Sequence, residues 1–368
     1  MSAILHQILY KIVSIVLSVM VVFGYSGNGI KADSSEWNTN YKYVFVHGLM
    51  GWGSYDDAYK LMPYWGMLGG DLMEYLNDKG FDCYAASVAP TSSAWDRACE
   101  LYAQLTGTVV DYGKAHSEEF GHDRYGADYS GKALIDSWSE KDKINLLGHS
   151  FGGATVRLFA SMLETGSEAE KAVTEKDDLS DFFKGGKGDW VYSVTSLAAP
   201  HNGTTAYNTG EDEEKEAEKD TATFDMYIDN AFALNKTIIT HKNTYYFSFA
   251  CDATKQNKDG TYSPDRTKME AMFADSSTEM GKFKGTTKGG YVIDESWQRN
   301  DGLVNTNSAL APSDAPCEAY DKNSVQPGIW NVMPVYDGDH MSLQGGFSIP
   351  NDVKDFYVEH LGMINKLG

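Results

Sequence analysis

One serine in the sequence has neighbours typical of a catalytic nucleophile. Ser150 lies in residues 144–153, INLLGHSFGG, where an apolar run enters a Gly-x-Ser-x-Gly turn and a helical pattern follows. Such a turn exposes the serine hydroxyl at the end of a strand, and Gly148 and Gly153 carry no side chains that would collide across the bend. The following helix directs its positive end to the place where an acyl oxyanion would form. We interpret Ser150 as a nucleophile for acyl transfer, with an incidental serine in a glycine-rich turn as the simpler alternative.

A serine hydroxyl needs a base to take its proton and an acid to orient that base. In enzymes that use this turn, the chain order is serine, acid, histidine. Among the nine histidines, His340 stands late in the chain on a polar loop, YDGDHMS, and we choose it as the base. Asp301, in RNDGLVNT, lies on a glycine turn between a polar approach and an apolar run. We favour Asp301 as the acid and leave its rivals Asp337 and Asp339 open.

The oxyanion of an acyl intermediate needs N–H donors. Residues 42–53, KYVFVHGLMGWG, form an early apolar run that ends in His-Gly. In hydrolases with this turn, the loop after such a strand supplies one N–H, and the residue after the nucleophile supplies the other. We therefore predict the backbone N–H groups of Leu49 and Phe151 as the donors.

Strands and helices alternate around these residues. Apolar runs at residues 81–89, 144–149, 189–200 and 244–251 read as buried strands, with helical patterns over residues 93–126 and 352–367. This alternation predicts an α/β-hydrolase fold, a mostly parallel central sheet with helices on both faces.

Length and charge limit the possible functions. The 368 residues are 42% hydrophobic, enough for one large α/β domain. Residues 1–32 have a basic start, an apolar segment and a small residue before a predicted cleavage at Ala32, so we expect a secretory signal peptide followed by a hydrolase domain over residues 33–368. The net charge of −21 disfavours binding to nucleic acid or to anionic lipid.

Three side chains that can bind metal ions precede the serine turn. Asp96, His116 and His122 lie in the helical pattern of residues 93–126. Histidines six positions apart do not share a helix face, where neighbours are three or four apart. One histidine on a helix and one in the turn GHDRYG could still converge. The residues alone favour surface histidines and leave a metal site open.

The motifs together resemble the secreted zinc-containing lipases of Gram-positive bacteria, the bacillary and staphylococcal group. The resemblance runs through most of the chain after residue 32: HGLMGWG, YWG, SSAWDRACELYAQLTGTVVDYGKAH, FGH, GHSFGG, SVTSLAAPHNGTT, DTATFD, NTYYFSFA, NDGLVNT and WNVMPVYDGDH. WDRAC followed by DYGKAH is far more specific than the serine turn. The resemblance implies an inserted zinc-binding lobe of about residues 54–130.

The resemblance also implies a role for each matching residue. These are the triad Ser150, Asp301 and His340, the oxyanion donors Leu49 and Phe151, and the zinc ligands Asp96, His116, His122 and Asp225, the last in DTATFD. Two imidazoles and two carboxylates with no open position suit a structural zinc ion. Such an ion would attach the lobe to the segment around residue 225 and would not activate water.

The chain departs from this family at three places. The first is Gly148, where this group often has alanine, and it does not affect the bend. The family's calcium site uses acids just after the catalytic histidine, and MSLQGGFSIP offers none, so we do not expect calcium. The family inserts a long amphipathic lid between HNGTT and DTATFD, where this chain has the acidic run 209–220. A segment this polar cannot cover an apolar acyl groove. We expect the lid to be absent or replaced by residues 255–290.

We therefore predict a secreted, monomeric serine lipase that acts on acylglycerols or other esters, without strong membrane binding. The alternative is a lidless carboxylesterase that prefers short-chain or soluble esters. Two other classes stay open: a zinc-stabilised binding protein that has lost catalysis, and a zinc hydrolase. The first would lack a triad residue, and the second needs an open coordination position.

Overall fold

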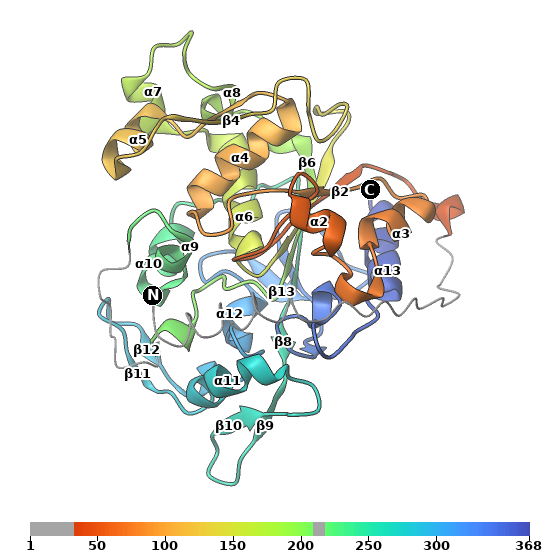
Figure 1. The fold of residues 1–368 in the computed structure, drawn as a ribbon, viewed down its shortest axis with the longest axis vertical. Helices are drawn as coiled ribbons and strands as arrows, with labels where there is room; N and C mark the ends of the chain where they lie inside the picture. Colours follow the sequence, from red (N-terminus) through yellow and green to blue (C-terminus); the bar gives the residue numbers. More distant parts are fainter. Residues whose placement is uncertain (1–32, 209–217) are drawn as a thin grey trace.

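A seven-stranded parallel sheet forms the centre of the protein (Figure 1). The computed structural model describes residues 33–208 and 218–368, so the predicted signal peptide and most of the acidic run lie outside the described residues. In spatial order the strands are β13 (Cys317–Ala319), β14 (Trp330–Val332), β7 (Tyr245–Phe249), β6 (Val191–Leu197), β5 (Ile144–His149), β1 (Lys42–Val46) and β2 (Cys83–Ala86). The predicted mostly parallel sheet is confirmed.

Helices cover both faces of this sheet, so its central strands β1, β5 and β6 are buried along their whole length. On one face α4 (Ala94–Thr106) and α6 (Phe151–Thr165) contribute to one hydrophobic cluster. On the other face α3 (Leu72–Asp78) and α13 (Lys354–Asn365) contribute to a second. The predicted α/β-hydrolase fold is therefore observed, with the serine turn between β5 and α6.

The remaining elements are short and connect these layers. The helices are α2 (Asp57–Leu61), α5 (Lys114–Phe120), α7 (Glu168–Val173), α8 (Asp181–Lys184), α9 (Ala222–Met226), α10 (Ile228–Asn235), α11 (Ala274–Met280) and α12 (Thr306–Leu310). The two-stranded pairs are β3 (Val109–Asp111) with β4 (Tyr125–Asp128), β9 (Thr254–Gln256) with β10 (Tyr262–Pro264), β11 (Gly285–Thr286) with β12 (Val292–Ile293), and β8 (Cys251–Asp252) with β15 (Tyr336–Asp337). No helix within the two described ranges is long and apolar enough to cross a bilayer.

The single helical pattern predicted over residues 93–126 is wrong. Helix α4 ends at Thr106, because Gly107 adopts a left-handed conformation with φ of +62° and its N–H caps the carbonyl of Ala103. The β-branched residues that follow form strand β3. This strand pairs with β4, which comes after α5 in the sequence. The pattern therefore contains two helices and a hairpin, and this arrangement returns His116 and His122 toward α4.

Elements α4, α5, β4, α7 and α8 lie together at the upper end of the molecule (Figure 1). We call this group the upper lobe. Of the predicted lobe of residues 54–130, only the part from α4 onward lies there. Helix α3 packs with α13 instead, because its apolar residues Leu72, Met73 and Leu76 belong to the cluster on the opposite face of the sheet.

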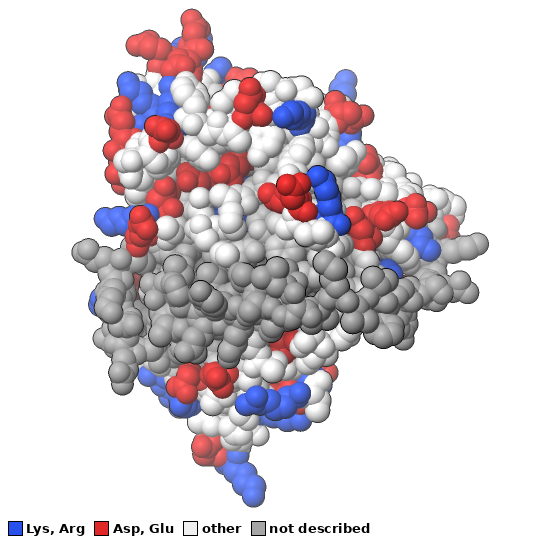
Figure 2. Space-filling model, viewed as in Figure 1, with Lys and Arg blue, Asp and Glu red and all other residues white. Residues whose placement is uncertain are grey.

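Acidic side chains gather on the upper lobe (Figure 2). Glu118 and Glu119 in α5 and Glu168 in α7 are exposed there.

Four buried histidines are expected to lower the free energy of unfolding in acid. Burial lowers the pKa of His47, His149 and His360 to about 3, and lowers the pKa of His201 well below its ordinary value. The native state therefore stays neutral at these residues while the unfolded chain binds protons. We expect the free energy of unfolding to fall below about pH 6.5, by about 1.4 kcal/mol per pH unit for each such histidine.

Denaturant titrations at a series of pH values measure this slope, and His360→Gln isolates one histidine. His360 lies in α13 against Phe247 and Phe249, and its Nδ1 atom is buried without a hydrogen-bond partner. In the variant, the dependence of the free energy of unfolding on pH in acid should become weaker, by the contribution of about one bound proton. An unchanged slope would mean that His360 is protonated in the native state.

Candidate functional site

Ser150 lies on a strained turn between β5 and α6. Its backbone has a φ of +55°, a conformation that costs energy for a residue with a side chain and is found at functional sites. The flanking glycines make this turn possible. A Cβ atom at Gly148 would lie 2.3 Å from the carbonyl oxygen of Gly152, and a Cβ atom at Gly153 would lie 2.3 Å from the side chain of Ala199.

The three residues of the predicted triad meet in the structure. His340 Nε2 lies 2.8 Å from the Oγ atom of Ser150, and His340 Nδ1 lies 2.9 Å from Oδ2 of Asp301. The carboxylate of Asp301 is 1% exposed, and its other oxygen accepts backbone N–H groups from Leu303 at 3.0 Å and Val304 at 2.7 Å. Asp301 is thus held from both sides, in a position that keeps the proton of His340 on Nδ1 and leaves Nε2 to accept the serine proton.

The two alternative acids have other partners. Asp337 forms a surface ion pair with Lys268 at 2.6 Å. Asp339 directs its carboxylate to the backbone N–H of Glu270 at 2.7 Å. Neither hydrogen-bonds to the His340 ring through its side chain, so of the three candidates Asp301 is the carboxylate placed to orient that ring. Its role as the acid remains a prediction.

The predicted oxyanion donors lie beside Ser150 in the structure. Leu49 lines the same pocket as Ser150 and His340, and Phe151 is the first residue of α6. A first helical residue has no acceptor within its own helix, so its N–H is free for a ligand. Within the described residues, neither of these two N–H groups donates a hydrogen bond to the protein. Their role as an oxyanion hole remains a prediction.

A second series of hydrogen bonds joins the loop after β1 to the loop that carries His340. Sequence analysis did not predict it. The N–H of Gly48 donates to the Tyr64 hydroxyl at 3.1 Å, and that hydroxyl lies 2.6 Å from His149 Nδ1. His149 Nε2 lies 2.7 Å from the carbonyl oxygen of His340. A carbonyl only accepts, so Nε2 carries the proton and Tyr64 donates to Nδ1. Gly48, Tyr64 and His149 lie in three motifs of the family resemblance, HGLMGWG, YWG and GHSFGG, but no sequence pattern indicates that they meet.

An apolar pocket of about 110 Å³ opens onto the triad. Apolar side chains form most of its walls: Leu49, Met50, Trp52, Met67, Met226, Met272, Phe273, Leu303, Val304, Met341 and Phe347. Of the segment 255–290, proposed from sequence as a replacement lid, only Met272 and Phe273 reach this pocket. A larger cavity of about 390 Å³, between residues 66–72 and 345–354, contains no triad residue. We therefore take the smaller pocket, which Ser150 and His340 line, as the candidate substrate pocket.

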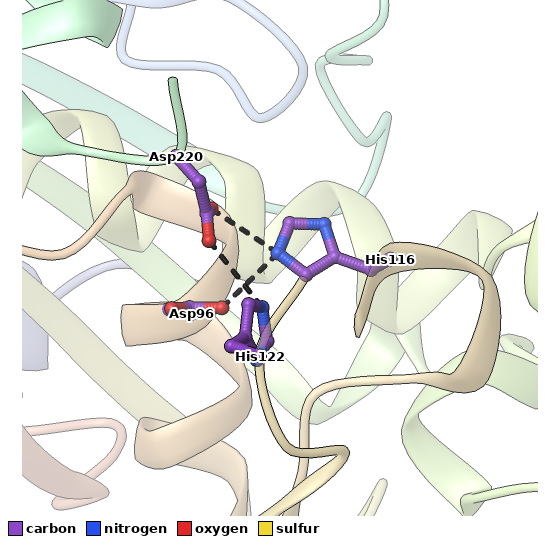
Figure 3. A group of neighbouring side chains, drawn as sticks. All are labelled: Asp96, His116, His122 and Asp220. Atoms are coloured by element: carbon purple, nitrogen blue, oxygen red, sulfur yellow. Dashed lines mark hydrogen bonds and ion pairs between the residues drawn. The ribbon is translucent and has the colours of Figure 1, made fainter. Parts of the chain in front are cut away.

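Four side chains, three from the upper lobe and one from the segment before α9, could hold a metal ion. One ligand atom from each of Asp96, His116, His122 and Asp220 lies within 4.8 Å of the others (Figure 3). His116 Nε2 is 3.2 Å from Asp96 and 3.1 Å from Asp220, and His122 Nε2 is 3.4 Å from Asp220. Helices α4 and α5, the turn after α5 and the segment before α9 each contribute one of them.

The chemistry of this group fits a metal ion. His122 Nδ1 lies 2.9 Å from the carbonyl oxygen of Asp123, so Nδ1 carries the proton and the lone pair of Nε2 faces the group. His122 Nε2 is buried and makes no hydrogen bond. The ring of Trp95 stacks on His116 at 5.1 Å between centroids and fixes its orientation. A nitrogen and oxygen set of this kind suits zinc among the common metals.

The fourth residue of this group is Asp220 and not Asp225, so that part of the prediction is corrected. Asp220 begins the motif DTATFD, and Asp225 ends it inside α9. The carboxylate of Asp225 accepts the backbone N–H of Ala94 at 2.8 Å and so caps the start of α4. Asp220 has a φ of +64°, and its carboxylate accepts from the Ser93 hydroxyl at 2.6 Å. Both carboxylates face α4, and the sequence alone did not decide which of them lies beside His116 and His122.

Comparison with known proteins supports the predicted resemblance. The family described as "Lipase-like, C-terminal domain" matches residues 39–218 and 211–360. The lipase of Staphylococcus hyicus is 32% identical, over 86% of this chain and 55% of the relative. Lipase 2 of Staphylococcus aureus is 30% identical, over 86% of this chain and 52% of the relative. The chain therefore spans about half the length of these curated relatives.

Solved structures agree over nearly the whole chain. EstA from Clostridium botulinum has a TM-score of 0.84 and 30% identity, covering 98% of both chains. The crystal structure of Staphylococcus hyicus lipase has a TM-score of 0.78 and 28% identity, covering 93% of this chain and 99% of that one. Lipase 1 from Pelosinus fermentans has a TM-score of 0.76 and 30% identity, covering 89% and 99%. The predicted resemblance to staphylococcal lipases is confirmed, and the chain belongs to the family of lipase-like C-terminal domains.

Proposed function

We propose that this protein is a secreted serine lipase that hydrolyses the ester bonds of acylglycerols. The hydrogen-bonded line from Ser150 through His340 to Asp301, opening onto an apolar pocket, carries the proposal. The relatives named lipases support it. The acyl chain would enter the apolar pocket, with the ester carbonyl at Ser150.

Each residue then has one task. His340 Nε2 takes the proton as Ser150 Oγ attacks the carbonyl carbon, and the N–H groups of Leu49 and Phe151 bind the oxyanion. His340 returns this proton to the departing alcohol, which leaves an acyl-enzyme. Water then attacks the acyl carbon, again with His340 as the base, and releases the acid. Asp301 keeps the imidazole oriented and stabilises its charged form.

We propose that the group formed by Asp96, His116, His122 and Asp220 holds a structural zinc ion. Zinc would supply a rigid link between α4, α5 and the segment before α9. That segment continues to Met226 in the pocket wall. With four protein ligands the site has no open position, so we assign it no part in the hydrolytic steps.

A carboxylesterase that prefers short or soluble esters is the second candidate. The pocket volume of about 110 Å³ favours it. The acidic run 209–220, in the position of the family lid, also favours it, because a sequence this polar lacks the apolar residues needed to cover the pocket.

A substrate profile tests both candidates. We expect hydrolysis of p-nitrophenyl butyrate and of dissolved tributyrin, and no jump in rate when tributyrin exceeds its solubility. Long-chain triglycerides in emulsion should be hydrolysed as well if the enzyme is a lipase, and poorly if it is a carboxylesterase. Ser150→Ala serves as the inactive control. Absence of hydrolysis for every ester would refute the proposed function, and a rate jump at the solubility limit would refute the lidless arrangement.

A further inference from the structure

Two carboxylates beside the catalytic histidine are buried without a cation. Glu270 is 1% exposed and Asp339 is 2% exposed. Within residues 33–208 and 218–368, neither forms an ion pair with lysine, arginine or histidine. Burial raises the pKa of Asp339 to about 6. Burying a carboxylate without a cation costs free energy unless N–H or O–H groups donate hydrogen bonds to it. The donors to Glu270 and Asp339 therefore show which segments these carboxylates hold together.

The donors to Glu270 come from one short stretch of backbone. Its Oε1 atom accepts the consecutive N–H groups of Phe347 at 2.8 Å, Ser348 at 2.5 Å and Ile349 at 2.9 Å. Its Oε2 atom accepts the Ser348 hydroxyl. Consecutive N–H groups that converge in this way form an anion-binding nest. Here the anion belongs to the protein itself.

Asp339 connects this nest to the catalytic loop. Its Oδ2 atom accepts the N–H of Glu270 at 2.7 Å, and its Oδ1 atom accepts the N–H of Met341 at 3.1 Å and the Ser342 hydroxyl at 2.9 Å. Asp339 directly precedes His340. The chain of contacts therefore runs from residues 347–349 through Glu270 to the loop that carries His340.

The segments joined in this way also form the pocket. Glu270 precedes the short 3-10 helix Ala271–Phe273, which places Met272 and Phe273 in the pocket wall. The ring of Phe273 meets the ring of His340 edge to face, with 6.3 Å between centroids. Phe347, whose N–H Glu270 binds, lines the same pocket. Glu270 thus contacts each of these parts: its carboxylate holds residues 347–349, and its backbone N–H is bound by Asp339 beside His340.

We infer that Glu270 is a positioning residue of the active site. Its buried carboxylate holds residues 347–349 against residues 270–273, and its backbone N–H is bound by Asp339 beside His340. The inference rests on the proposed function. Loss of this carboxylate would release residues 347–349 and allow the His340 ring to move relative to Ser150. A misplacement of about 1 Å in a catalytic group costs about a hundredfold in rate.

Glu270→Ala with rescue by a small carboxylate is the direct test. We expect kcat for p-nitrophenyl butyrate to fall by about a hundredfold, with a smaller change in KM, because the base is displaced more than the substrate. Formate or acetate should enter the vacated nest and restore kcat with a saturating dependence, whereas chloride at equal ionic strength should not. Glu270→Gln, which keeps one acceptor oxygen, should lose less activity and covers the case in which Glu270→Ala does not fold.

Glu279→Ala is the matched control. Glu279 lies on α11, close in sequence, and its contact is a surface pair with Lys282 at 2.8 Å. We expect the control to keep the activity of the parent enzyme. The inference is overturned if folded Glu270→Ala matches the control in kcat. It is also overturned if the lost activity follows the unfolded fraction alone and no carboxylate restores it.

A measurement without substrate separates this inference from the proposed function. The Nδ1 proton of His340 in its bond to Asp301 should give a downfield proton NMR signal, assigned by its absence in His340→Gln. We expect Glu270→Gln to shift or broaden this signal and Glu279→Ala to leave it unchanged. An unchanged signal in Glu270→Gln would overturn the positioning role. Failure of the parent enzyme to hydrolyse esters would overturn the proposed function while this comparison still reports on Glu270.

Discussion

Replacing Ser150 by alanine is expected to lower kcat for p-nitrophenyl butyrate by about a millionfold, as does the loss of a triad nucleophile in a serine protease. Among the residues that the structure describes, Ser150 Oγ is the only serine hydroxyl bonded to His340, so we expect no neighbouring hydroxyl to take over the attack. His340→Ala should cost as much, because an unactivated hydroxyl is a poor nucleophile. Asp301→Asn should lower kcat by about ten-thousandfold, since an amide can stabilise the wrong tautomer of His340.

Steady-state kinetics on purified variants, with circular dichroism to verify folding, measure these effects. The double variant Ser150→Ala/His340→Ala supplies the control. The two residues act as a unit, so the double variant should be no slower than either single variant. An organophosphate ester should label the parent enzyme at Ser150 and should not label the alanine variant. Turnover retained by Ser150→Ala, or a label on another residue, would contradict the triad.

Removal of the proposed metal ion is expected to give the second largest effect, a loss of stability. A ligand that binds only the native state stabilises it by about 4 kcal/mol when its concentration is a thousand times its Kd. For a domain of this size the melting temperature would fall by on the order of 10 °C. Chelation with EDTA, followed by calorimetry and metal analysis, measures the effect. Activity should fall with the fold, because Met226 in the pocket wall follows Asp220 by six residues.

Asp220→Asn and Asp225→Asn form a matched pair for the same site. Asp220→Asn removes a predicted metal ligand, and we expect it to lose the bound metal and to resemble the chelated protein. Asp225→Asn changes the cap of α4, and we expect it to keep one metal ion per chain with a weaker affinity, by about ten- to a hundredfold. Equal metal loss in both variants would contradict the assignment. Chelation that abolishes activity without lowering the melting temperature would favour a zinc hydrolase.

The sequence predicted the parts of the site that depend on local chain geometry. The turn around Ser150 is encoded within a few residues, because glycines at 148 and 153 are needed where a Cβ atom would collide. Leu49 and Phe151 follow from the same logic, since their backbone positions are set by the ends of neighbouring strands. His340 required elimination and chain order, and the choice of Asp301 over Asp337 and Asp339 required the family resemblance. The structure brings all three triad residues together.

Other parts of the site depend on which side chains meet across long chain separations. Asp220 and Asp225 are five residues apart, and only the packing of the segment before α9 against α4 decides which carboxylate faces His116 and His122. The Tyr64–His149 hydrogen bond and the Glu270 nest are contacts of the same kind. No local pattern marks Glu270, because its partners are backbone N–H groups some 77 to 79 residues away.

The sequence by itself determined the α/β fold, the nucleophile turn and the chemical types needed for acyl transfer, because strand periodicity and turn sterics act within short stretches of chain. The break of residues 93–126 into two helices and a hairpin was also encoded locally, at Gly107, yet the apolar pattern hid it. Only the tertiary structure decided the fourth residue of the candidate metal group, the shape of the apolar pocket beside Ser150 and the contacts that support His340. Those features arise from side chains and N–H groups that satisfy one another across the core, and burial leaves them no water as an alternative partner.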